Sequence, residues 1–96
     1  SCKMDQGAPL VAALERAAVS GPRFASPEAM DAVRQAIPRG PRADRLERRM
    51  RASGLKDLVL DMLQGLQLGH TRAELHCCEQ LRALALAIKL VVCDTL

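Results

Sequence analysis

Residues 73–96, AELHCCEQLRALALAIKLVVCDTL, carry the pattern that decides the fold. On a helix each residue turns by about 100°. At that step the segment has one apolar arc, formed by Leu81, Leu84, Ala85, Ile88 and Val92. A second apolar stripe lies on the side that should be polar, and it holds Leu75, Leu86, Leu90 and Cys93. We therefore expect a long C-terminal helix over about 71–94 that is buried on more than one side.

The second stripe has two explanations. The first helix of the chain covers it, so that the bundle is closed, or another chain covers it. The second explanation predicts a homodimer or a groove that accepts a partner helix.

Proline and glycine divide the rest of the chain into four shorter helices, expected at about 8–20, 26–37, 43–52 and 55–68. The clearest start is Ser26-Pro27, a capping serine followed by a proline in the first helical position. Apolar residues recur at helical spacing in three of these segments. They are Leu10, Val11, Leu14 and Ala18, then Met30, Val33 and Ile37, then Leu55, Leu58, Val59, Met62, Leu63 and Leu66. Thr71 and Glu74 form a capping-box pattern before the last helix.

The composition favours helices over sheets. Apolar residues make up 49% of the 96-residue chain, yet Phe24 is the only aromatic residue. Strands draw on aromatic and β-branched residues, whereas helices draw on Ala, Leu, Arg and Glu. We therefore predict a compact all-α bundle of about five helices packed around a long C-terminal helix. It forms a single domain over 8–96, after a flexible N-terminal segment of residues 1–7.

The adjacent residues His76, Cys77 and Cys78 raise the question of a metal or redox site. On a helix they point in three different directions, and no Cys-x-x-Cys pair supports a zinc site. Both cysteines fall within or beside the apolar arc, where cysteine is a small core residue, and His76 falls on the polar side. We expect no catalytic residue, metal, cofactor or small-molecule substrate.

The stretch PRGPRADRLERRMR, residues 38–51, contains six arginines against Asp44 and Glu47. Ion pairs are expected between Asp44 and Arg48 and between Glu47 and Arg51, at i,i+4. This leaves a predicted arginine face of Arg39, Arg42, Arg45 and Arg49. Three interpretations stay open: a solvated helix face, a site for an acidic protein partner, or a site for nucleic acid or phosphoinositide.

These features predict a non-catalytic adaptor or assembly domain of a larger intracellular protein, cytoplasmic or nuclear. It would bind a partner helix or an acidic segment through the apolar stripe, the arginine face or both. The alternative is a nucleic-acid-binding helical domain that uses residues 39–51. No membrane span is expected, because the apolar run over 83–93 is about half the length that a span needs and Lys89 interrupts it.

Overall fold

The computed structural model describes residues 7–54, 57–69 and 73–92. It has five α-helices in this part of the chain, with one short 3₁₀ helix and no strands. They are α1 (Ala8–Ala17), α2 (Pro27–Ala36), α3 (Pro41–Ala52), α4 (Asp57–Gln67), the 3₁₀ helix η1 (Ala73–His76) and α5 (Cys78–Val92). The predicted all-α bundle is confirmed. Several predictions fall outside the described residues. They concern the flexible N-terminal segment, of which only Gly7 is described, and the residues Leu55, Thr71 and Cys93.

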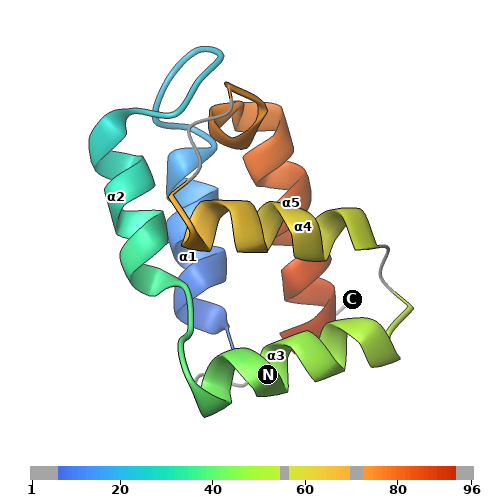
Figure 1. The fold of residues 1–96 in the computed structure, drawn as a ribbon. Coiled ribbons are helices and arrows are strands. Elements are labelled where there is room, and N and C mark those ends of the chain that lie inside the picture. Colours follow the sequence, from blue (N-terminus) through green and yellow to red (C-terminus); the bar gives the residue numbers. More distant parts are fainter. Residues whose placement is uncertain (1–6, 55–56, 70–72, 93–96) are drawn as a thin grey trace.

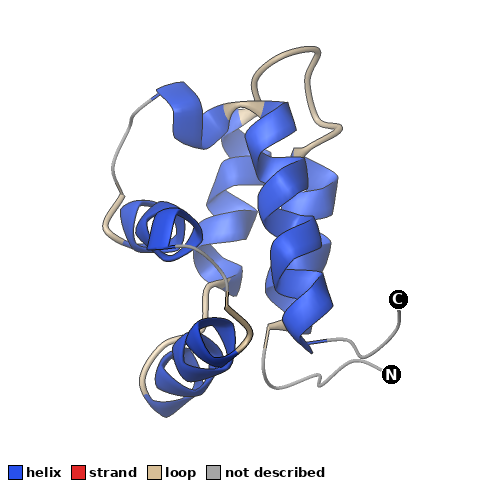
Figure 2. Cartoon of the chain, turned by 90° about the vertical axis from the view of Figure 1, so that its right-hand side faces the viewer, coloured by secondary structure: helices blue, strands red, loops and turns tan. Residues whose placement is uncertain are grey.

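The helices form two groups (Figure 1). Helices α1 and α5 run side by side, and α2 packs along α1. Helices α3 and α4 run across these upright helices, α4 at mid-height and α3 below it. The quarter-turned view shows both crossing helices end-on, on one side of α1 and α5 (Figure 2).

Local sequence signals explain where the shorter helices begin. The Ser26 hydroxyl accepts a hydrogen bond of 3.2 Å from the Ala29 amide and caps α2, as predicted. Helix α3 begins at Pro41, two residues earlier than expected. Gly40 takes a φ of +65° that suits glycine, and Pro41 tolerates the first helical turn because it has no amide hydrogen to leave unpaired.

The predicted helix over 71–94 is wrong in one respect, because the chain is not helical at Cys77. The Ala25 amide donates to the His76 carbonyl, and the Cys78 amide donates to the Arg23 carbonyl, both at 2.8 Å. These two bonds form an isolated β-bridge between Phe24 and Cys77. A long-range backbone contact has thus replaced helical bonds, and only residues 78–92 form α5.

The predicted apolar residues of the first two helices and the apolar arc of α5 are buried. The core contains Leu10, Val11, Leu14, Ala18, Met30, Val33, Ile37, Leu81, Leu84, Ala85, Ile88 and Val92. Helix α4 differs from the prediction, because Val59, Met62 and Leu63 are only half-buried and Leu66 alone of its described predicted stripe is buried. Leu63 borders a groove of about 220 Å³ between α3 and α4, which Leu46, Met50, Leu60 and nine other residues also line.

Candidate interaction surface

The outer face of α5 exposes two leucines one turn apart. Leu86 is 58% exposed and Leu90 is 41% exposed. Helix α1 packs against α5 but leaves both uncovered, so the closed-bundle explanation of the second stripe is wrong. The stripe is also shorter than predicted, because Leu75 belongs to η1 and is buried. Cys93 lies outside the described residues.

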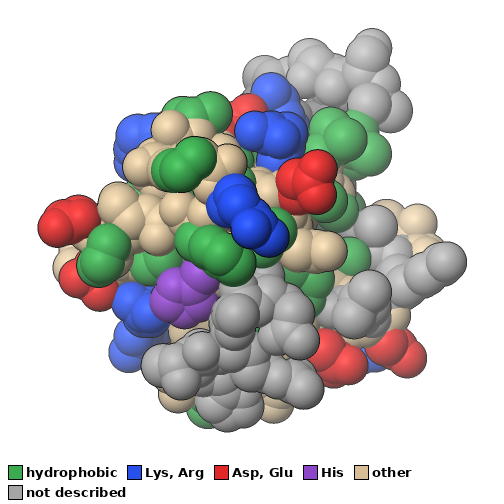
Figure 3. Space-filling model, turned by 90° about the horizontal axis from the view of Figure 1, so that it is seen from above, with side chains coloured by type: hydrophobic (Ala, Val, Ile, Leu, Met, Phe, Trp, Pro, Cys, Tyr) green, Lys and Arg blue, Asp and Glu red, His purple; other side chains and the backbone are tan. Residues whose placement is uncertain are grey.

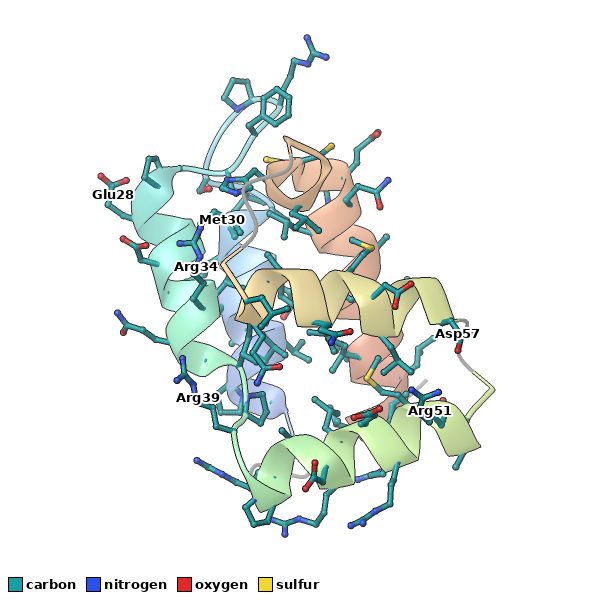
Figure 4. The ribbon with its side chains drawn as sticks, in the orientation of Figure 1. Glu28, Met30, Arg34, Arg39, Arg51 and Asp57 are labelled. Atoms are coloured by element: carbon teal, nitrogen blue, oxygen red, sulfur yellow. The ribbon has the colours of Figure 1, made fainter. Side chains whose placement is uncertain are left out.

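The α3 arginines are paired differently from the prediction. Arg51 donates from Nε and from a terminal nitrogen to Glu47, at 3.2 and 3.0 Å, which confirms that pair. Arg51 also lies 3.8 Å from Asp57 at the start of α4 (Figure 4). No ion pair joins Asp44 to Arg48 among residues 41–52 as the structure describes them. Arg48 therefore adds to the basic surface, although the prediction assigned it to a pair.

The residues of the predicted arginine face are spread along α3 and line different hollows. Arg39 comes from the α2–α3 loop, at the far end of α3 from Arg51 (Figure 4). Arg42 lines a small hollow with residues of α1 and α2. Arg45 and Arg49 instead line a shallow hollow of about 340 Å³ together with Arg48 and Ala52. Arg42 thus lines a different hollow from Arg45 and Arg49.

Arg49, which lines the same hollow as Arg45 and Arg48, connects α3 to α5. Its guanidinium donates a hydrogen bond of 2.7 Å to the Val91 carbonyl, in the last turn of α5. A cation at this position satisfies a terminal carbonyl and complements the helix dipole. Leu90 precedes Val91 in the chain, so this bond joins α3 to the turn of α5 that carries the exposed Leu90. We call Leu86, Leu90, Arg45 and Arg48 the leucine–arginine surface.

The adjacent residues His76, Cys77 and Cys78 contact the α1–α2 region of the fold. Cys78 is buried, as predicted, and its Sγ lies 3.8 Å from the Ala17 carbonyl and 3.4 Å from the Gly21 carbonyl, within reach of weak S–H hydrogen bonds. Cys77 is half-buried. His76 ends η1 and is half-buried, and its Nε2 atom is buried with no hydrogen-bond partner in the described residues.

No group of three or more His, Cys, Asp or Glu side chains in residues 7–54, 57–69 and 73–92 is placed to hold a metal ion. None of the described helices has the length and hydropathy to cross a membrane. Comparison of the chain with protein-family models, curated proteins and solved structures found no significant match.

Proposed function

We propose that the chain is a protein-interaction domain that binds an acidic amphipathic helix of another protein on the leucine–arginine surface. The observation that carries the proposal is the exposure of Leu86 and Leu90 on α5, whose last turn is bonded to the arginine-rich helix α3 through Arg49. Two apolar side chains one turn apart match the i, i+4 anchors by which helices recognise each other. The role would be that of an adaptor or assembly domain.

Charge selects the partner. Arg45 and Arg48 line the hollow, and no carboxylate pairs with either among the described residues. A partner helix with acidic residues beside its apolar stripe would satisfy these guanidinium groups while its apolar side chains cover the leucines. Arginine suits this role because its planar fork binds carboxylates in a bidentate manner.

The proposal is tested by selecting binders from a display library of randomised amphipathic helices on the immobilised chain. We expect the selected helices to be acidic. Their affinity should fall about tenfold or more for Leu86→Gln/Leu90→Gln and for Arg45→Glu/Arg48→Glu. Leu68→Gln, which changes another exposed leucine, and Arg39→Glu/Arg42→Glu, at the other end of α3, are the matched controls and should bind normally.

Three results would overturn this proposal. One is the recovery of no helix, or of helices indifferent to all four changes. Another is a dimer by sedimentation equilibrium that Leu86→Gln/Leu90→Gln converts to a monomer, because the occupant would then be a second copy. The third is salt-dependent binding of duplex or single-stranded nucleic acid that Arg45→Glu/Arg48→Glu abolishes and the leucine changes leave intact.

A further inference from the structure

The loop between α1 and α2 holds the only aromatic side chain of the chain at the surface. Phe24 is 48% exposed and the nearby Val19 is 74% exposed. A phenylalanine that packed in the core would contribute about 1.5 to 3 kcal/mol through burial. Figure 3, which views this end of the molecule, shows hydrophobic side chains at the surface beside Lys or Arg side chains.

Many contacts fix the shape of this loop. The Ser26 amide donates to the Ser20 hydroxyl at 2.9 Å, and that hydroxyl donates to the Ala17 carbonyl at 2.7 Å. The bridge between Phe24 and Cys77 ties the far side of the loop to the start of α5. The loop turns so tightly that a Cβ on Gly21 would lie 2.1 Å from the Phe24 carbonyl oxygen. A surface held in this way loses little conformational entropy when it binds.

The loop and the start of α5 enclose a hollow of about 550 Å³. Its lining includes Val19, Phe24, Cys77, Glu79 and two arginines, Arg23 and Arg82. The Arg23 guanidinium lies 5.7 Å from the centre of the Phe24 ring, and Arg82 donates to the Ala18 carbonyl at 3.3 Å. Neither arginine forms an ion pair within the described ranges. The hollow thus combines an apolar wall with two unneutralised guanidinium groups against one carboxylate.

We infer that this hollow binds a short segment of another protein in which a carboxylate neighbours an apolar side chain. The apolar side chain would pack against Phe24 and Val19, and the carboxylate would accept hydrogen bonds from Arg23 and Arg82. Charge complementarity decides the occupant, because the two guanidinium groups outnumber Glu79. Aromatic and arginine side chains on a rigid frame are also typical of residues that dominate binding energy.

This hollow is a second binding surface, and the inference does not rest on the proposed function. It shares no residue with the leucine–arginine surface. Changes to Arg23 or Phe24 leave Leu86, Leu90, Arg45 and Arg48 intact. Failure of one proposal is therefore distinguishable from failure of the other.

The test uses a display library of random linear heptapeptides selected on the whole chain. We expect the recovered peptides to contain Asp or Glu next to an apolar residue. Their dissociation constant, measured by titration calorimetry, should rise about tenfold or more for Arg23→Glu/Arg82→Glu and for Phe24→Ser. Leu86→Gln/Leu90→Gln and Leu68→Ser are the controls and should not change it.

A second measurement localises the peptide. Cys77 lines the hollow and is half-buried, so a bound peptide should slow its reaction with a thiol reagent. Arg82→Glu could unfold the chain, because it removes the hydrogen bond to the Ala18 carbonyl. In that case the variant Arg23→Glu/Phe24→Ser replaces it, because neither of these side chains makes a hydrogen bond in the described residues. Peptides without acidic residues, unchanged affinity in both variants or unprotected Cys77 would each overturn the inference.

Discussion

The Arg49 guanidinium donates a hydrogen bond of 2.7 Å to the Val91 carbonyl and so joins the basic end of α3 to the last turn of α5. Arg49 therefore has a structural role, although the sequence suggested that it faces a partner. The contact joins the helix that carries Arg45 to the helix that carries Leu90.

Replacing Arg49 should destabilise the fold. We expect Arg49→Ala to lower the free energy of unfolding by about 1.5 to 3 kcal/mol, because it removes a charged hydrogen bond to a terminal carbonyl. Arg48→Ala, an exposed neighbour, should change it by no more than about 0.5 kcal/mol. Urea titration of both variants measures the difference, and equal stabilities would show that the Arg49 contact is not stabilising.

The two sides of α5 should respond differently to truncation. Leu81 is fully buried, so Leu81→Ala should cost about 2 to 5 kcal/mol through lost burial and a cavity. Leu86→Ala should cost at most about 0.5 kcal/mol, because the side chain is already exposed to water. Thermal and urea unfolding provide the comparison. A cost at Leu86 as large as at Leu81 would mean that this chain buries both sides of the helix.

The tight loop predicts a severe effect at Gly21. Gly21→Ala should cost more than about 2 kcal/mol, because the new methyl group would meet the backbone of Phe24 and not a flexible side chain. Gly54→Ala is the matched control: its φ is +79°, yet a Cβ there meets nothing within 4 Å. It should cost about 1 to 2 kcal/mol from backbone strain alone. Similar losses at the two positions would argue against the close approach.

The two neighbouring cysteines should differ in reactivity. Cys78 is 6% exposed and sits against α1, whereas Cys77 is half-buried at the edge of a hollow. In the native protein a thiol reagent should therefore modify Cys77 much faster than Cys78, which should react at the rate of unfolding. Peptide mapping after timed labelling separates the two residues. Rapid modification of Cys78 would place it at the surface.

The N-terminal cap of α2 gives a smaller effect. Ser26→Ala removes the hydroxyl that accepts from the Ala29 amide and should cost about 1 kcal/mol. Ser26→Asp should restore most of the loss, because aspartate is also a good cap and complements the helix dipole. Denaturant midpoints measure both changes. No difference between Ser26→Ala and Ser26→Asp would show that the cap contributes little.

Helical periodicity predicted most of the fold. The arc from Leu81 to Val92 is buried, and Pro and Gly placed the ends of most helices within a few residues, because these signals are local. The break at Cys77 was not predictable in this way, since it depends on backbone bonds to Arg23 and Ala25, more than fifty residues away. The burial of α4 was overestimated because the spacing of apolar residues shows which side of a helix is apolar. It does not show how closely another helix packs against that side.

The candidate surfaces were predicted only in part. The second apolar stripe drew attention to Leu86 and Leu90 in the sequence. Whether another helix of the same chain covers these leucines could be decided only from the position of α1. The division of the arginines depends on where α3 crosses α5. Phe24 carried one sequence signal, its being the only aromatic residue, but nothing in the pattern placed it beside Arg82.

The central claim is that Leu86 and Leu90 form a binding site for an acidic helix, and one measurement tests it most directly. It is the dissociation constant of the best selected helix for the wild-type chain and for Leu86→Gln/Leu90→Gln, with the stability of both confirmed by urea unfolding. Our account predicts about a tenfold or greater loss of affinity with little change in stability. Unchanged affinity in a folded double variant would contradict it.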